Sequence, residues 1–206
     1  MINAVIFDFD GVIADSLGVA LQTVNQFLRY WRKKPLTKDF IRAHDLEVVF
    51  HNYGTNRIQE LILFLQIRSS IRKNLARISI HEHIYPIMTS MARTNALSIL
   101  TWNSPNNVLD FLRIHHLHNY FVAVHGNFLM FNKEKGINDL VNKENLRKEC
   151  VVYIGDEPRD VRAAKKAGVK SIAVDWGYSD RQLLEKAFPD AIASNSEQLL
   201  DLIAKI

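Results

Sequence analysis

Short apolar runs that alternate with helical patterns constrain the fold of this chain more than any other feature. Five runs of four to six residues are rich in β-branched or aromatic residues, and each is too short for a buried helix. Runs of this kind are typical of strands buried on both faces of a parallel sheet. The expected strands are Ala4–Asp8, Ala96–Thr101, Phe121–His125, Val151–Gly155 and Ser171–Val174.

Helical patterns fill most of the intervals between these runs. In one of them Ser104 and Pro105 supply an N-cap residue followed by proline at the first helical position. Strands that alternate with helices predict an α/β fold, a doubly wound parallel sheet whose ligand lies outside the carboxyl ends of the strands. The expected helices are Ser104–His115, Lys135–Lys143, Arg159–Ala167 and a last one from Ser196.

The segment between Ser16 and about Ile80 breaks this alternation. It contains no clear strand, and its helical periodicity covers Leu17–Tyr30, Asp39–Val49 and Thr55–Ile71. A compact domain does not need so long a connection without structure of its own. The sequence therefore predicts a core of residues 1–15 and 80–206, with a small helical domain of residues 16–79 inserted after the first strand.

Composition excludes several classes of protein. The 206 residues are 48% hydrophobic and 23% charged, which is ordinary for a globular chain. A single cysteine allows no internal disulfide and no cysteine-based zinc site. The N-terminus lacks the basic region of a signal peptide, and no apolar run approaches the ~20 residues of a membrane span. We expect a soluble protein of a reducing compartment, most simply the cytoplasm, with no membrane partner.

The charge balance is mildly basic, with a formal net charge of +4 and an isoelectric point of about 9.2. Such a charge favours anionic small substrates as readily as nucleic acid. The chain has no glycine/aromatic RNA-binding signature and no Cys/His finger. We therefore expect no nucleic-acid partner.

Two carboxylates follow the first expected strand. Asp8 and Asp10 are two residues apart, and Gly11 lets the chain turn directly after them. Such a pair at the edge of a sheet can hold Mg²⁺, which prefers oxygen ligands. One carboxylate can act as a covalent nucleophile and the other as general acid and base. Taken alone, the pair fits a loop with two solvated aspartates equally well.

Groups suited to a phosphate follow the second strand. The strand ends in Thr101, and Trp102, Asn103 and Ser104 lead into the next helix. A hydroxyl together with backbone N–H groups at a helix N-terminus makes a phosphate site. The alternative is a plain helix cap provided by Ser104.

A lysine and further acids follow the third and fourth strands. Lys133 and Lys135 precede a helix, where a cation can neutralise a phosphoryl oxygen. Asp156 and Asp160 come after the fourth strand, where they could complete a metal site. A solvated lysine and an acidic cluster at a helix N-terminus are the plain alternatives. Together, however, these groups make up the set that phosphoryl transfer requires, each at the carboxyl end of a strand.

The motifs resemble those of the haloacid dehalogenase-like hydrolases, in the phosphoglycolate phosphatase-like branch. The segment DFDGVIADS looks like the first motif of that family, LTWNSPNNV the second, Lys133 the third and YIGDEPRDVRAAKKAGV the fourth. The resemblance covers residues 1–16 and about 80–206, and it extends to the insert only in size and helicity. Trp102 departs from the pattern, because the family more often has a smaller residue there.

This resemblance implies a Mg²⁺-dependent phosphatase, a phosphoric monoester hydrolase. Asp8 would attack phosphorus, and Asp10 would protonate the leaving alkoxide and then activate water to hydrolyse the aspartyl-phosphate. Asp8, the main-chain carbonyl of Asp10 and Asp156 would bind the metal. Glu157 would lie beyond the residues that coordinate the metal directly.

The resemblance also implies roles for the remaining motif residues. Thr101 and the loop of Trp102 and Asn103 would hold phosphoryl oxygens together with Lys133, and Asp160 would position Lys133 or a metal-bound water. Lys133 is preferred to Lys135 because Ile137 follows it by four residues, as an apolar helix position does in the family; Lys135 remains the alternative.

The insert stands where the family has a helical cap, which favours a small phosphorylated metabolite as substrate. Candidates to face its organic group are Arg42, His51, Asn56 and Arg57, although surface or core roles are commoner for each. A monomer or homodimer is expected. Three alternatives stay open: a phosphomutase of the same superfamily, a phospho-accepting signalling protein and a non-catalytic phosphate-binding descendant.

Overall fold

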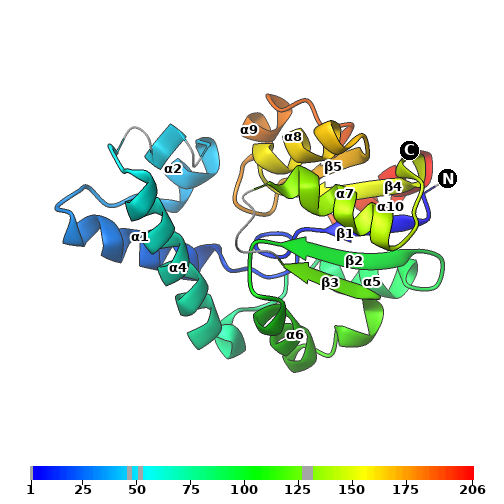
Figure 1. The fold of residues 1–206 in the computed structure, drawn as a ribbon, viewed down its shortest axis with the longest axis horizontal. Coiled ribbons are helices and arrows are strands. Elements are labelled where there is room, and N and C mark those ends of the chain that lie inside the picture. Colours follow the sequence, from blue (N-terminus) through cyan, green and yellow to red (C-terminus); the bar gives the residue numbers. More distant parts are fainter. Residues whose placement is uncertain (1, 46–47, 51–52, 127–131) are drawn as a thin grey trace.

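The computed structural model describes residues 2–45, 48–50, 53–126 and 132–206, and these contain a six-stranded parallel sheet (Figure 1). The strand order is β3-β2-β1-β4-β5-β6, so β1 lies in the middle with β2 and β4 as its neighbours. The prediction of an α/β fold with a doubly wound parallel sheet is confirmed. The strands are β1 Ala4–Phe7, β2 Ala96–Thr101, β3 Ala123–Gly126, β4 Val151–Gly155, β5 Lys170–Val174 and β6 Ala191–Ala193.

Both faces of the sheet are covered, which explains the uninterrupted apolar strands. In β1, Ala4 and Ile6 pack in one cluster with helices α7 and α8, whereas Val5 and Phe7 pack in another with α5, α6 and α10. Because successive side chains of a strand point to opposite faces, the two groups of helices cover opposite faces of the sheet. Their bounds are α5 Ile84–Met91, α6 Pro105–Ile114, α7 Lys133–Lys143, α8 Pro158–Ala167 and α10 Ser196–Lys205.

The segment after β1 forms a separate group of helices at one end of the molecule (Figure 1). It contains α1 Leu17–Tyr30, α2 Lys38–Ala43 and α4 Arg57–Lys73, and residues 48–50 are also helical. We call residues 17–73 the helical insert. The chain leaves the core at Ala14 and returns at Ile80, and these two residues form an antiparallel bridge.

Some predicted elements differ from the observed ones. The expected single helix Asp39–Val49 is wrong, because α2 ends at Ala43 and the next residue, His44, is extended. Helix α5 was not predicted: it has no capping side chain, and Pro86 stands at its third position. Strand β6 is only three residues long, too short to show a period, and the five-residue helix α9 Arg181–Glu185 was missed for the same reason.

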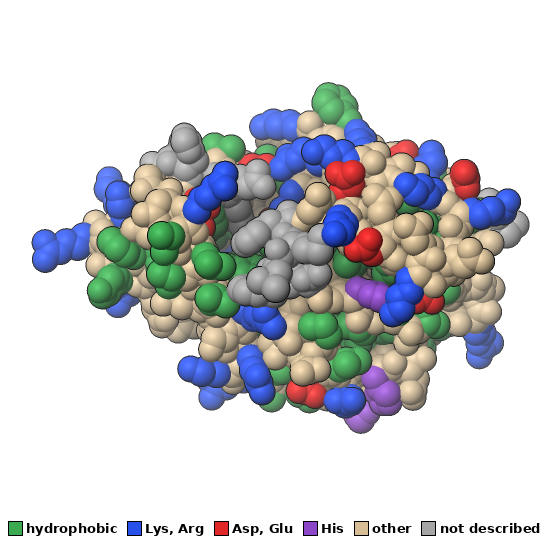
Figure 2. Space-filling model, in the orientation of Figure 1, with side chains coloured by type: hydrophobic (Ala, Val, Ile, Leu, Met, Phe, Trp, Pro, Cys, Tyr) green, Lys and Arg blue, Asp and Glu red, His purple; other side chains and the backbone are tan. Residues whose placement is uncertain are grey.

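Apolar side chains are exposed on the helical insert, where Figure 2 shows hydrophobic groups gathered at the left end of the molecule. On α4 the exposed ones are Ile58, Leu61, Ile62 and Leu65.

Among the described residues, no helix combines the length and the apolar character that crossing a bilayer requires.

Candidate active site

The candidate site lies where β1 and β4 end side by side, the point at which the strand order of a doubly wound sheet changes direction. The chain turns sharply after Asp10 because Gly11 adopts φ +85°, a region that favours glycine. A Cβ atom at Gly11 would lie 2.0 Å from Oδ2 of Asp156. The turn after β1 therefore packs directly against the acidic end of β4.

Asp8 and Lys133 form a buried ion pair at the centre of the site. Nζ of Lys133 lies 2.5 Å from Oδ2 of Asp8 and also contacts Oδ1 of Asp160. Oδ1 of Asp8 accepts a hydrogen bond from the backbone N–H of Phe9 at 2.7 Å. Burial raises the pKa of Asp8 to about 7 although Lys133 acts in the opposite direction. Burial alone would lower the pKa of Lys133, but Asp160 and Asp8 raise it well above its ordinary value.

Lys135, the alternative lysine, is exposed, and its backbone N–H belongs to the cap of α7 formed by Asn132. The structure thus brings Lys133, and not Lys135, into contact with Asp8.

Asp10 is held by two hydrogen bonds from different parts of the chain. Oγ of Ser16 donates to its Oδ1 at 2.8 Å, and Nδ2 of Asn103 donates to its Oδ2 at 3.1 Å. The hydroxyl of Tyr178 lies 3.0 Å from Oγ of Ser16 and extends this chain to the loop after β5. Burial raises the pKa of Asp10, and the bonds from Ser16 and Asn103 counteract this effect. A carboxyl group with a raised pKa suits a residue that must both give and take a proton.

The loop after β2 is built around Asn103. Its side-chain oxygen accepts hydrogen bonds from the N–H of Ser104 at 2.8 Å and from Nδ2 of Asn107 at 3.1 Å. Its side-chain nitrogen therefore points to Asp10. The hydroxyl oxygen of buried Thr101 accepts the N–H of Asn103 at 3.0 Å and retains its own proton to donate.

Trp102 lies in the wall of the site. The guanidinium carbon of Arg159 is 3.9 Å from the centre of its ring, and Phe64 of α4 meets the ring edge-on at 6.0 Å. Arg159 also forms an ion pair with Glu157. The bulky residue thus joins the fourth motif to the helical insert.

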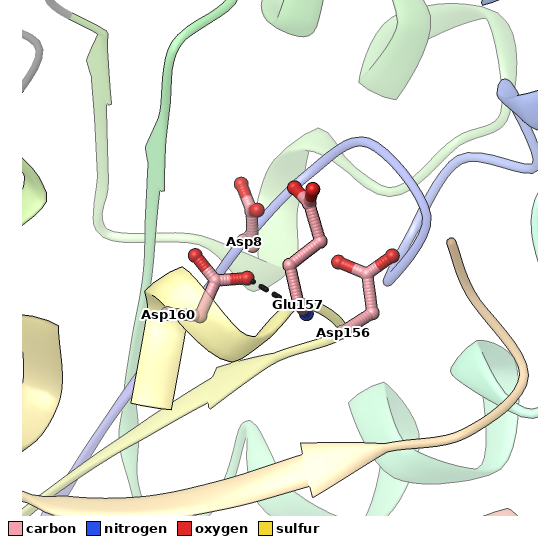
Figure 3. Close-up of side chains that lie close together, drawn as sticks. All are labelled: Asp8, Asp156, Glu157 and Asp160. Atoms are coloured by element: carbon pink, nitrogen blue, oxygen red, sulfur yellow. Dashed lines mark hydrogen bonds between the residues drawn. The ribbon is translucent and has the colours of Figure 1, made fainter. Parts of the chain in front are cut away.

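Four carboxylates gather at the ends of β1 and β4 (Figure 3). One oxygen from each of Asp8, Asp156, Glu157 and Asp160 lies within 4.8 Å of the others. All four side chains are buried. Burial raises the pKa of Asp156 well above its ordinary value, and that of Glu157 is raised for the same reason. Lys133 and Arg159 offer two positive charges to these four carboxylates, so a further cation is needed to compensate them when all are ionised.

The residues fit a divalent metal ion. Oδ2 of Asp156 accepts the N–H of Tyr178 at 2.7 Å, but its Oδ1 is buried and, within the described residues, has no hydrogen-bond partner. An orphaned carboxylate oxygen beside Asp8 offers the all-oxygen environment that Mg²⁺ prefers. Glu157 belongs to this cluster of carboxylates, whereas the sequence suggested a position beyond the residues that coordinate the metal.

A cavity of about 320 Å³ lies against these groups and extends towards the helical insert. Most of the predicted site residues line it, while Asp156 and Asp160 do not. Those that line it are Asp8, Asp10, Thr101, Trp102, Asn103 and Lys133, and Glu157 and Arg159 of the fourth motif line it as well.

The polar candidates of the insert that the structure describes are not among the residues that line the cavity. Arg42 donates its guanidinium N–H groups to main-chain oxygens of the loop after β5. Asn56 caps α4 through a reciprocal pair of hydrogen bonds with Gln59, and Arg57 is exposed. His51 lies outside the described residues.

Sequence reasoning gave no role to Tyr178, Ser16, Asn107 or Arg159. Tyr178 and Ser16 are 162 residues apart, so no local pattern could have joined them. Ser16 and Arg159 do stand inside the first and fourth motifs, where their polarity could have drawn attention.

A parallel sheet with paired acids, a buried lysine and a metal-suited carboxylate group at its switch point defines a hydrolase of the phosphatase type. A family model described as haloacid dehalogenase-like hydrolase matches residues 5–174, so the chain belongs to the haloacid dehalogenase-like hydrolases. Its relatives place it in the phosphoglycolate phosphatase-like branch of that family.

The phosphoglycolate phosphatase of Synechococcus elongatus is 28% identical over 99% of this chain and 98% of its own length. A phosphoglycolate phosphatase of Vibrio vulnificus is 24% identical over 98% and 96% of the two chains.

Among solved structures, a predicted phosphatase from Clostridium acetobutylicum has a TM-score of 0.86 at 21% identity, with both chains fully covered. A haloacid dehalogenase-like family protein from Streptococcus pneumoniae has a TM-score of 0.81 at 21% identity, with 98% of each chain covered. These structures support the fold alone.

Proposed function

We propose that this protein hydrolyses a small phosphomonoester in a Mg²⁺-dependent reaction through an aspartyl-phosphate on Asp8. The observation that carries the proposal is the position of Asp8 and Asp10 at one end of the same cavity, each held by separate partners. Lys133 fixes Asp8, while Ser16 and Asn103 fix Asp10.

In this proposal a carboxylate oxygen of Asp8 forms a bond to phosphorus as the bond from phosphorus to the ester oxygen breaks. Asp10 gives its proton to the departing alkoxide, which leaves as the alcohol. Asp10 then takes a proton from water, which attacks the aspartyl-phosphate and releases inorganic phosphate.

The phosphoryl oxygens would be held by the Thr101 hydroxyl, the loop of Trp102 and Asn103, and the Lys133 ammonium. Asp160 would position Lys133. Asp8, the carbonyl of Asp10 and Asp156 would hold Mg²⁺, and Glu157 lies near enough to be a further ligand. When bound, the ion would supply positive charge that offsets the charge of the phosphoryl group.

The proposal gives two parts of the chain different roles. Residues 1–15 and 80–206 would form the catalytic core, and residues 16–79 would cover the cavity as a cap that excludes water. We place the protein in the cytoplasm, acting on a phosphorylated metabolite as a monomer or homodimer.

Release of phosphate from a panel of small phosphomonoesters, with Mg²⁺ and with chelator, tests this proposal. The expected result is Mg²⁺-dependent release that Asp8→Asn abolishes while circular dichroism shows an intact fold. Full-rate hydrolysis by Asp8→Asn would overturn the assignment of the nucleophile. Transfer of the phosphoryl group to an organic product, in place of release of inorganic phosphate, would identify a mutase.

A further inference from the structure

The cavity has two chemically different ends. The end formed by the core carries the acids, amides and Lys133 described above. The end formed by the helical insert is mostly apolar, because one face of α1 and one face of α4 both turn large aliphatic or aromatic side chains into it, although Glu60 and Arg68 of α4 also line it. Six of these residues are Leu17, Leu21, Val24, Leu63, Phe64 and Ile67.

The spacing of these residues follows from the helical period. In α1 they recur at intervals of three and four, and in α4 Leu63, Phe64 and Ile67 occupy a single face. Leu63 and Val24 are buried, whereas Leu21, Phe64 and Ile67 are half-buried where they meet the cavity. Side chains from two helices thus form an apolar wall of the cavity, which is more than a single exposed side chain.

Among the described residues that line the cavity, few charged groups stand outside the catalytic residues. Arg159 is engaged by Glu157 and stacked on Trp102. Glu60 accepts a hydrogen bond from Thr55 at 3.0 Å, and its charge would repel an anionic substrate group. Arg68 is the cation that α4 brings to the cavity.

A carboxylate on the organic part of the substrate would leave water to face this wall, which costs free energy unless it is paired. An apolar group there would instead gain from burial. The volume of the cavity also favours a larger apolar group, because cavities of roughly 300–1,000 Å³ hold ligands of drug size. A glycolate group would leave much of this cavity unfilled.

We propose that the preferred substrate is the phosphate monoester of an apolar alcohol, branched aliphatic or aromatic, larger than glycolate and without a carboxylate. This inference rests on the proposed function. The reaction takes one water, breaks the bond from phosphorus to the alcohol oxygen, and yields the free alcohol and inorganic phosphate. The apolar group would lie between α1 and α4 with the phosphate at Asp8.

Benzyl phosphate and phosphoglycolate provide the test, because both have an alkyl leaving group and they differ in the character of the organic part. We expect kcat/KM for benzyl phosphate to exceed that for phosphoglycolate by about tenfold or more. Equal values, or a preference for phosphoglycolate, would overturn the inference while leaving the proposed function intact.

Binding separates the inference from the proposed function. If neither ester is hydrolysed, the proposed function fails, and the inference is judged by the thermal shift that each ester gives with Asp8→Asn. Stronger stabilisation by benzyl phosphate would support the apolar site, and the absence of any difference would overturn it.

Two substitutions on the same helix supply a matched comparison. Ile67→Arg puts a charge into the wall, and Leu65→Arg puts the same charge on the exposed face of α4. We expect Ile67→Arg to lower the ratio of the benzyl to the glycolate kcat/KM about tenfold and Leu65→Arg to leave it unchanged. A ratio is insensitive to loss of folded protein, because both esters report on the same molecules. An unchanged ratio in Ile67→Arg would contradict the proposal.

Arg68→Leu addresses the cation in the wall. We expect the preference for benzyl phosphate to persist or increase in this variant. A wild-type enzyme that hydrolyses phosphoglycolate well, combined with selective loss of that activity in Arg68→Leu, would assign Arg68 to a substrate carboxylate and overturn the inference.

Discussion

The guanidinium of Arg42 donates a 2.5 Å hydrogen bond to the carbonyl oxygen of Gly177 and so ties α2 of the helical insert to the loop after β5. The same side chain reaches the carbonyls of Asp175 and Trp176. The next residue of that loop, Tyr178, donates its N–H to Asp156 and contacts Ser16 through its hydroxyl. One loop therefore touches the insert, the metal-suited carboxylate and the partner of Asp10.

Arg42→Met is expected to weaken this connection. A single hydrogen bond to a charged group contributes roughly 1.5–3 kcal/mol, so the loss of these bonds should lower the free energy of unfolding by at least about 2 kcal/mol. We also expect kcat to fall, because the loop that positions Tyr178 becomes less constrained. Urea unfolding and steady-state kinetics measure the two effects. The control is Arg57→Met, which removes an exposed arginine of the same insert; equal effects of both variants would contradict the role of Arg42.

Lys133 and Lys135 should differ sharply in their substitutions. Lys133→Met leaves Asp8 and Asp160 buried without their cation, and breaking a buried ion pair costs about 3–5 kcal/mol. Loss of a charge that faces the phosphoryl group should also lower kcat by roughly 10²–10³. Lys135→Met removes only an exposed charge. Phosphate release and urea unfolding of the two variants measure these differences in activity and stability. A larger loss of activity in Lys135→Met would assign the catalytic role to Lys135 and contradict the role of Lys133.

Mg²⁺ should stabilise the protein more at pH 8 than at pH 6. The pKa of Asp8 is raised from 3.8 to about 7, chiefly by burial. Without metal, the folded state therefore holds a proton that the unfolded chain has already released, and stability falls as the pH rises from about 4 to 7. Mg²⁺ must displace that proton, so its affinity increases over the same range.

Thermal unfolding with and without Mg²⁺ at the two pH values measures this effect. At a concentration of 100 times Kd the ion would stabilise the fold by about 2.7 kcal/mol. Asp156→Asn serves as the control, since it replaces one carboxylate oxygen by an NH₂ group, removes the negative charge and should abolish the shift. A Mg²⁺ shift that is equal at both pH values would disagree with the raised pKa of Asp8.

Tyr178→Phe should lower kcat with little change in KM. Tyr178 lines the cavity, but phenylalanine keeps its ring there, and the hydroxyl that is removed reaches Asp10 only through Ser16. A hydrogen bond contributes about 0.5–1.5 kcal/mol, which corresponds to a decrease in kcat of roughly 2- to 13-fold. Ser16→Ala, which removes one of the two direct hydrogen-bond partners of Asp10, should have the larger effect. An increase in KM alone would show that Tyr178 contacts the substrate instead.

The sequence predicted the parts of the fold that depend on local patterns. The strands Ala96–Thr101 and Val151–Gly155 and the helix Leu17–Tyr30 have the bounds expected from periodicity. The sequence could single out Asp8, Asp10 and Lys133 as candidate site residues because each follows the carboxyl end of a strand. The topology of a parallel sheet then brings them together without any knowledge of contacts.

Other features depend on tertiary contacts and left no local pattern. Arg42 was considered as a substrate-facing residue, but its partners lie more than 130 residues away in the loop after β5. Nothing in the sequence around Arg42 indicates that loop. The apolar end of the cavity was likewise hidden, because its helical faces look like an ordinary buried stripe until α1 and α4 are placed beside Asp8.

Gly177 is expected to be essential for metal binding for a steric reason. A Cβ atom there would lie 2.2 Å from Oδ2 and 2.5 Å from Cβ of Asp156, a separation that real side chains do not tolerate. Gly177→Ala must therefore displace either the loop or the carboxylate. We expect the Kd for Mg²⁺ to rise by about 10- to 100-fold, the range seen when groups that orient a ligand are disturbed.

Gly18→Ala is the matched control. Gly18 lies in α1, and a Cβ atom at this position would meet nothing within 4 Å. The substitution should leave Mg²⁺ binding unchanged and stabilise the helix by up to about 1 kcal/mol. Isothermal titration with Mg²⁺ and thermal unfolding of both variants measure the difference. If Gly177→Ala bound Mg²⁺ as tightly as the wild type, the prediction would be wrong, and the clash with Asp156 would be relieved by a shift of the loop and not of the carboxylate.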